Sequence, residues 1–267
     1  IMKKRFFSLI GLLFAISIFQ SFDANIASTS AKNKIDNYKD SCVTNKLLST
    51  DNETAKFNEV ELGKTNIIGG LNVIRRIESR SELNDVLSLT NLPQAIIYKL
   101  DNSLNAVLDD AIDVSIDEMI SSTNNKIIPV FDIDSNEKAD LLADYLKNHE
   151  YYDCFVLSAD SSVVKHFRDM LPNVSSVIDY QSRLENKDSL SKDDLLDIRK
   201  DIHKNYGNVA ILPVEFCSHD NIQYLYDSIV NVWSIVDSDS KVDLYKSILS
   251  GSIGVITDYT ESLYDIA

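Results

Sequence analysis

Short apolar runs rich in isoleucine and valine alternate with amphipathic stretches along most of this chain. The runs are bounded by polar residues and lack strict alternation, which is typical of strands buried on both faces of a parallel sheet. The pattern predicts about eight strands separated by helices. The predicted strands are Asn66–Gly69 or Asn72–Ile77, Gln94–Lys99, Lys126–Ile133, Asp153–Leu157, Val174–Ile178, Val209–Val214, Val230–Val236 and Ile253–Thr257.

Hydroxyl and carboxyl side chains mark the expected helix starts. Ser79 with Glu82, and Ser115 with Glu118, have the spacing of a capping box. Eight strand–helix units in about 200 residues fit the lower size limit of an α/β fold of the (β/α)8 TIM-barrel type. An open doubly wound sheet is the alternative, although no G-x-G-x-x-G follows the first strand, which argues against dinucleotide binding. Later helices are expected to start after Asp134 or Ser135, after Ser191, and after Asp237 or Ser238.

The N-terminus predicts export. Lys3, Lys4 and Arg5 precede the apolar stretch Phe6–Phe19, which is shorter than the ~20 residues of a membrane span. Small residues at 29–31 suit a signal peptidase, so residues 1–31 are interpreted as a signal peptide and the protein as secreted or cell-surface. An uncleaved signal anchor is the alternative and the one expected route to a membrane. Residues 32–63 are predicted to be a polar linker or arm, which leaves 64–267 for the barrel domain.

The charge balance narrows the range of partners. The chain has 41 acidic and 26 basic residues, a net charge of −15. Residues 1–31 hold three basic residues and one acid, so the remainder carries −17. Such a surface excludes nucleic acid and anionic membranes as partners. The oligomeric state is not indicated.

Cysteine and histidine usage excludes two further classes of protein. The three cysteines, Cys42, Cys154 and Cys217, are too few for a disulfide framework. No C-x-x-C or H-x-x-x-H occurs, so a zinc site is not expected. Cys154 and Cys217 lie in apolar runs and are interpreted as buried thiols.

The last two predicted strands each end in an acid, in the segments Val230–Asp237 (VNVWSIVD) and Gly251–Asp258 (GSIGVITD). They are similar to the closing segment of the glycerophosphodiester phosphodiesterase family, V-x-V-W-T-V-N/D followed by G-V-D-G-I-I-T-D. Ile128–Asp134 resembles the P-l-l-x-E-i-K strand of that family, and Cys154–Asp160 its v-i-i-S-S-F-d strand. The resemblance covers residues 94–267. It implies a TIM barrel that hydrolyses glycerophosphodiesters to glycerol phosphate and an alcohol with a bound Ca²⁺ or Mg²⁺.

The catalytic motifs that this resemblance implies are missing. The family carries H-R-G on its first strand, then E-N-T, E-x-D and H-D, with two histidines as acid and base. Asn66–Gly70 (NIIGG) stands where H-R-G is expected, and Lys99–Asp101 lies near the expected H-D. The four histidines, His149, His166, His203 and His219, fall in predicted helices or loops, so no catalytic residue is assigned.

The resemblance and the strand ends together predict a site for Ca²⁺ or Mg²⁺ made by Asp132, Asp134 and Glu215. Asp132 matches the metal-binding Glu of the family, and Asp134 stands where the family has Lys. Side chains two apart on a strand point the same way, and like charges ~4 Å apart repel by about 4 kcal/mol at an effective dielectric near 20. Phosphate binding there therefore needs a cation. The alternatives are that Asp134 caps a helix and that Glu215 merely faces water.

Other side chains are candidates for contact with a ligand. Trp233, the single tryptophan, and Ser158 are predicted to bind substrate, with core packing and helix capping as the respective alternatives. Arg75, Arg76 and Lys99 are the cationic side chains that could reach a phosphate.

Three functions follow from these patterns. The first is an exported phosphodiesterase-like barrel that has lost acid–base catalysis and binds a small phosphodiester or polyol as an accessory module. The second is an active metal-dependent phosphodiesterase that uses Asp132, Asp134 and Glu215, with water as nucleophile. The third is a carbohydrate-active barrel with two carboxylates as acid and base.

Overall fold

A computed structural model describes residues 71–109, 114–123, 126–260 and 262–263. The predicted signal peptide and polar arm, the alternative first strand Asn66–Gly69 and Cys42 lie outside these residues. Among the described helices, none is both long and apolar enough to span a bilayer.

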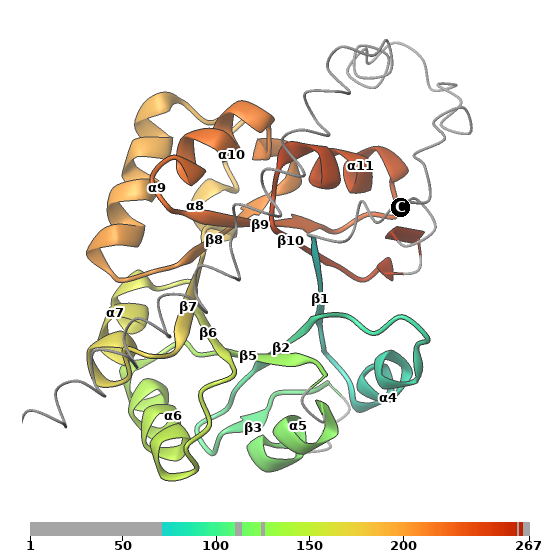
Figure 1. Cartoon of the computed structure of the whole chain (residues 1–267), viewed down its shortest axis with the longest axis vertical. Coiled ribbons are helices and arrows are strands. Elements are labelled where there is room, and N and C mark those ends of the chain that lie inside the picture. The colour runs from blue at the N-terminus through green and yellow to red at the C-terminus, as the bar shows by residue number, and fades with distance from the viewer. Residues whose placement is uncertain (1–70, 110–113, 124–125, 261, 264–267) are drawn as a thin grey trace, which may run out of the picture. The chain divides into compact units, whose positions relative to one another are not determined.

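Eight parallel strands close into a barrel in the order β1-β10-β9-β8-β7-β6-β5-β2, and Figure 1 shows them as a ring. This confirms the predicted TIM barrel over the open sheet. Each predicted run overlaps a barrel strand, although the runs for β6 and β7 end one residue too early, and the first strand is the second of its two alternatives. The strands are β1 Asn72–Arg76, β2 Ala95–Lys99, β5 Ile128–Asp132, β6 Phe155–Ser158, β7 Ser175–Asp179, β8 Val209–Pro213, β9 Asn231–Val236 and β10 Gly254–Thr257.

Helices surround the ring of strands, as parallel strands require crossover connections. An antiparallel hairpin that the sequence did not predict, β3 Asn105–Ala106 with β4 Val114–Ser115, lies in the connection after β2. The helices are α4 Arg80–Ser88, α5 Ile116–Thr123, α6 Asn136–Asn148, α7 Ser161–Met170, α8 Gln181–Leu184, α9 Lys192–Lys204, the 3₁₀ turn η3 Val214–Phe216, α10 His219–Tyr226 and α11 Lys241–Ser250.

Most of the predicted caps are present. Ser79 and Ser135 accept hydrogen bonds from the third backbone N–H of α4 and α6, and Ser191 forms a complete capping box with Asp194. The predicted cap at Asp237 or Ser238 is wrong. Helix α11 begins later, and its cap is Ser240.

The apolar side chains form an inner and an outer layer. The inner cluster takes alternate residues from all eight strands, because successive side chains of a strand point to opposite faces. Two larger clusters fill the space between strands and helices. Cys154 and Cys217 are buried free thiols in this outer layer, as predicted.

Candidate binding site at the barrel mouth

Charged residues occupy the carboxyl ends of the strands. Each follows an inner-cluster residue of its own strand by two positions, as Asp132 follows Val130 and Asp179 follows Val177. The same alternation therefore directs these side chains toward the open end of the barrel, here called the mouth. The mouth residues are Arg76, Lys99, Asp132, Asp179 and Asp237.

Two cations and two carboxylates form the centre of the mouth. Arg76 Nη2 lies 3.7 Å from Asp179 Oδ2. Lys99 and Asp132 are register partners on the neighbouring strands β2 and β5. Both cations and Asp179 act electrostatically on Asp132, so the four side chains form one group.

Burial makes the carboxylates of the mouth weaker acids. It raises the pKa of Asp132 from 3.8 to about 6, and the Asp179 charge adds to this while Arg76 and Lys99 oppose it. Burial also raises the pKa of Asp179, against the hydrogen bond from the Gln181 N–H and the charge of Arg76. Acids whose neutral form is stabilised near neutral pH are common at functional sites.

Asp134 points away from this group. Its carboxylate pairs with Lys138 Nζ at 2.9 Å, and the same Nζ donates to the carbonyl oxygen of Leu100 at 2.7 Å. The helix cap is the neighbouring Ser135, so the alternative role of Asp134 as a cap is wrong. Because Lys138 offsets the charge of Asp134, most of the repulsion expected from it is removed. The charge of Asp134 is the smallest of the influences that act on the pKa of Asp132.

Glu215 lines a cavity that reaches the mouth residue Asp237. After β8 the chain turns into η3, where Glu215 is exposed and lines a cavity of about 600 Å³. The cavity lies at the carboxyl ends of β8 and β9, and its lining also includes Glu185, Asp237 and Asp243. Among the described residues that line it, neither Asp132 nor Trp233 occurs.

The predicted metal ligands therefore do not fit a bound Ca²⁺ or Mg²⁺ as a set. Asp134 is paired with Lys138, and the cavity that Glu215 lines does not include Asp132 among its described lining residues. In the part of the chain that is described, no three Asp, Glu, His or Cys side chains are grouped as metal ligands. The individual ligand roles stay predictions.

The two predicted substrate contacts are both buried. Trp233 belongs to the inner cluster, where it meets Phe155 edge-on at 5.2 Å between ring centroids and lies over Gly254. Phe155 and Gly254 begin their strands, so the indole lies toward the amino ends, away from the mouth. Ser158 is fully buried, and its Oγ accepts a hydrogen bond from the Asp160 N–H. These positions favour core packing for Trp233 and a local structural role for Ser158.

All four histidines of the chain are described, and none lies on a barrel strand. His166 and His203 lie within α7 and α9, His149 ends α6, and His219 begins α10. His166 pairs with Asp140 at 2.8 Å on the outer surface. The expected first motif at Asn66–Gly70 lies outside the described residues, and β1 ends in Arg75-Arg76.

The sequence reasoning named Arg76 and Lys99 without a position and missed Asp179. The predicted strand ended at Ile178, one residue too early, so Asp179 was not seen as a strand end. All three share one sequence signal that could have found them. Each is a charged residue at the end of an apolar run, two positions after an apolar residue, so that both side chains point to the same face of the strand. Arg75 has the opposite orientation, and its guanidinium pairs with Glu82 at 2.6 Å outside the barrel.

Solved structures share this fold. A glycerophosphodiester phosphodiesterase from Agrobacterium tumefaciens aligns with a TM-score of 0.56 at 7% identity, covering 73% of this chain and 99% of that one. One from Parabacteroides distasonis gives 0.55 at 11%, covering 74% and 96%. A phosphodiesterase from Oleispira antarctica, in complex with the product sn-glycerol-3-phosphate, gives 0.53 at 10%, covering 75% and 98%.

Sequence comparison adds nothing to this likeness. No protein-family model matches the chain, and no curated protein matches it. At such low identity the structural likeness concerns the fold. The described chain is a closed (β/α)8 barrel of the kind found in glycerophosphodiester phosphodiesterases, as its sequence resemblance predicted.

Proposed function

We propose that the barrel mouth binds a small ligand of the glycerophosphodiester class, which combines a phosphate group with free hydroxyl groups. The observation that carries the proposal is the group of Arg76, Lys99, Asp132 and Asp179 at the mouth. Guanidinium and ammonium groups bind phosphate oxygens, and carboxylates accept hydrogen bonds from hydroxyls. The bound sn-glycerol-3-phosphate of the Oleispira protein supports this class of ligand.

The proposal assigns binding rather than hydrolysis to this mouth. General acid–base catalysis of phosphodiester cleavage needs groups that exchange protons near the scissile bond. All four histidines lie on helices or at helix ends, so none supplies an imidazole from a strand end. A barrel with a cationic pair and no imidazole pair suits a binding or accessory module.

One observation favours a second candidate, an active phosphodiesterase. The raised pKa of Asp132, about 6, suits a carboxyl group that exchanges protons near neutral pH. In that case Asp132 acts as the acid or base, with a divalent cation as the predicted cofactor. A carbohydrate-active barrel would also use a carboxyl group with a raised pKa as its acid. An assay for hydrolysis of aryl glycosides tests that function.

Calorimetric titration of the purified protein with sn-glycerol 3-phosphate and glycerophosphocholine tests the proposal. We expect saturable binding that Arg76→Ala and Lys99→Ala each weaken about tenfold, since each removes a charged hydrogen-bond donor to phosphate. Lys126→Ala is the matched control, because Lys126 is exposed and precedes β5 at the opposite end of the barrel. It should leave the affinity unchanged.

Incubation with glycerophosphocholine and Ca²⁺ or Mg²⁺ separates the two candidates. The binding proposal expects no release of glycerol phosphate. Metal-dependent release that Asp132→Ala abolishes would refute it in favour of the active enzyme.

Export is also part of the proposal, and the basic and then apolar residues 1–31 support it. N-terminal sequencing of the protein recovered from the medium or the cell surface tests it. A new N-terminus near residue 32 is expected. Retention of the whole segment in the cytoplasmic fraction would contradict export.

A further inference from the structure

Helix α8 determines the direction of the Asp179 carboxylate. The Gln181 N–H donates to Asp179 Oδ1 at 2.8 Å, while Oδ2 faces Arg76. Helix α8 has only four residues and no side-chain cap, so it cannot hold its own position. The orientation of Asp179 therefore depends on the contacts that anchor α8 to the rest of the barrel.

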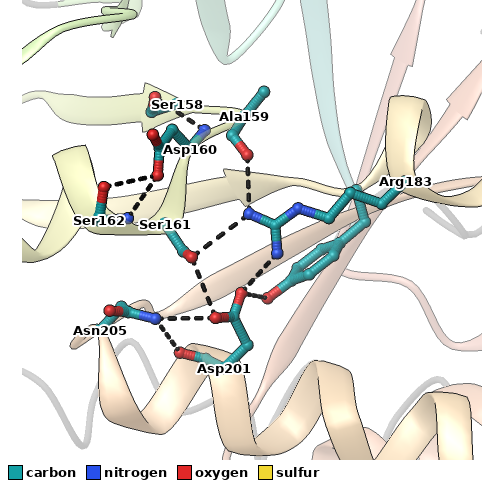
Figure 2. A network of polar contacts seen from close by, with 9 residues as sticks. Ser158, Ala159, Asp160, Ser161, Ser162, Arg183, Asp201 and Asn205 are labelled. Carbon is teal, nitrogen blue, oxygen red and sulfur yellow. Dashed lines mark hydrogen bonds and ion pairs between the residues drawn. The ribbon is translucent and has the colours of Figure 1, made fainter.

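Asp201 of helix α9 is one such anchor. Its Oδ2 accepts hydrogen bonds from Tyr180 Oη at 2.9 Å and from Arg183 Nη1 at 2.7 Å. Asn205 Nδ2 donates to the Oδ1 atom and the carbonyl oxygen of Asp201, both at 2.9 Å, which fixes this carboxylate (Figure 2). Residues at both ends of α8 are thus attached to one side chain of α9.

Arg183 extends the anchor to the loop after β6. Its Nη2 donates to the Ala159 carbonyl oxygen at 2.9 Å and to Ser161 Oγ at 3.3 Å (Figure 2). Its guanidinium also lies 5.0 Å from the Tyr180 ring centroid. Arg183 is therefore the side chain that joins α8, α9 and the β6–α7 loop.

We propose that Arg183 is a positioning residue for Asp179, and that it thereby sets the preference of the mouth for phosphates that carry hydroxyl groups. This inference rests on the proposed function, in which Arg76 and Lys99 bind the phosphate and Asp179 accepts a ligand hydroxyl. Attraction between a phosphate and a cation changes gradually with distance. A hydrogen bond weakens steeply once its angle is distorted. Displacement of Asp179 should therefore weaken the hydrogen bond to a ligand hydroxyl more than it weakens the binding of the phosphate group.

The charge of Arg183 also favours recognition of a hydroxyl group by Asp179. It lowers the pKa of Asp179 against the effect of burial, together with Arg76. This contribution favours the ionised carboxylate, the form that only accepts hydrogen bonds.

Titration of the full chain with sn-glycerol 3-phosphate and with inorganic phosphate tests the inference. We expect Arg183→Met to weaken binding of glycerol 3-phosphate about tenfold, the cost of one charged hydrogen bond, and binding of inorganic phosphate less than twofold. Asp201→Asn, which weakens the anchor from its other side, should have the same selective effect. Arg183→Lys should restore part of the selectivity, because an ammonium can still donate to Asp201.

Arg168→Met is the matched control. Arg168 lies at the far end of α7 and also donates to backbone carbonyl oxygens, those of Pro172 and Val174. We expect it to lower the melting temperature and leave the selectivity between the two ligands unchanged.

An Asp179→Ala background tests whether Arg183 acts through Asp179. In that background Arg183→Met should cause no further loss of glycerol 3-phosphate affinity, although its effect on melting temperature should persist. Equal weakening of both ligands by Arg183→Met, or a full further loss without Asp179, would overturn the inference alone. Failure of the wild-type protein to bind either ligand would instead refute the proposed function, and the inference with it.

Discussion

Asp132 is the residue whose chemistry departs furthest from that of an ordinary surface carboxylate. It ends β5 between Lys99 and the Arg76–Asp179 pair, and burial raises its pKa to about 6. The neutral acid is thus favoured in the folded state. The stabilisation from Asp132 is fully present below its ordinary pKa of 3.8 and is lost as the pH rises through about 6.

The pH dependence of stability should therefore change in Asp132→Asn. Because the pKa rises from 3.8 to about 6 and one pKa unit corresponds to about 1.4 kcal/mol, we expect this variant to raise the unfolding free energy at pH 7.5 by about 3 kcal/mol. Little gain is expected at pH 3, where the wild-type carboxyl is largely protonated in both states because its ordinary pKa is 3.8. Urea unfolding at both pH values, with EDTA present, measures this.

Asp144→Asn is the matched control, because Asp144 is exposed on α6. It should change stability by less than about 0.5 kcal/mol at either pH. A gain in Asp132→Asn of the same size at both pH values would show that the carboxyl is not the cause.

At the scale of elements, Lys138 connects three segments around the mouth. Its side chain, only 10% exposed, reaches from α6 to Asp134 after β5 and to the Leu100 carbonyl oxygen after β2. This one ammonium group thus holds together the loops that follow two adjacent barrel strands.

Removal of that ammonium should destabilise the fold. We expect Lys138→Met to lower the unfolding free energy by about 2 kcal/mol, since it leaves a buried carbonyl oxygen and a carboxylate without their donor. Chemical denaturation followed by circular dichroism measures the loss. Lys147→Met on the exposed face of the same helix should cost less than about 0.5 kcal/mol. Equal losses in the two variants would contradict the role of Lys138.

The strands could be predicted because a strand buried on both faces is a continuous apolar run, whatever its partners. The first strand could not be chosen from its sequence, since Asn66–Gly69 and Asn72–Ile77 are both apolar. In the structure the second alternative pairs with β2, the next barrel strand along the chain, and with β10, which is distant in sequence and could not be inferred from a local pattern. The β3–β4 hairpin was missed because two-residue strands carry no periodicity.

The site was predicted less well than the strands, because a strand end does not determine the direction of the next residue. Asp132 lies at the mouth since it is still part of β5, whereas Glu215 follows the end of β8 and lies in the η3 turn. Asp134 pairs with a lysine four residues later, which the strand pattern could not indicate. Asp179 lies at the mouth because it ends β7, whereas the direction of its carboxylate depends on the Gln181 N–H of α8.

At the scale of the whole molecule, the net charge of −15 destabilises the folded state, because like charges repel one another more strongly in the compact chain. Salt screens the repulsion between exposed carboxylates. We expect an increase from 10 to 200 mM NaCl at pH 7.5 to stabilise the protein by about 1 kcal/mol, or about 2–4 °C in melting temperature. Differential scanning calorimetry measures the shift.

The control for this effect is the same salt series at the pH where the net charge is zero. There the melting temperature should not rise with salt. A melting temperature that falls with salt at pH 7.5 would contradict the prediction. It would mean that the ion pairs stabilise the protein by more than the repulsion between carboxylates destabilises it.

The position of Trp233 gives the molecule a built-in optical reporter. It is the chain's single tryptophan, 2% exposed within the inner cluster, and its indole N–H finds no hydrogen-bond partner among the residues that the structure describes. Its fluorescence should therefore be blue-shifted in the native state and move to longer wavelengths only when the barrel opens. A ligand that occupies the strand ends should leave this spectrum unaltered, so emission separates occupancy from unfolding.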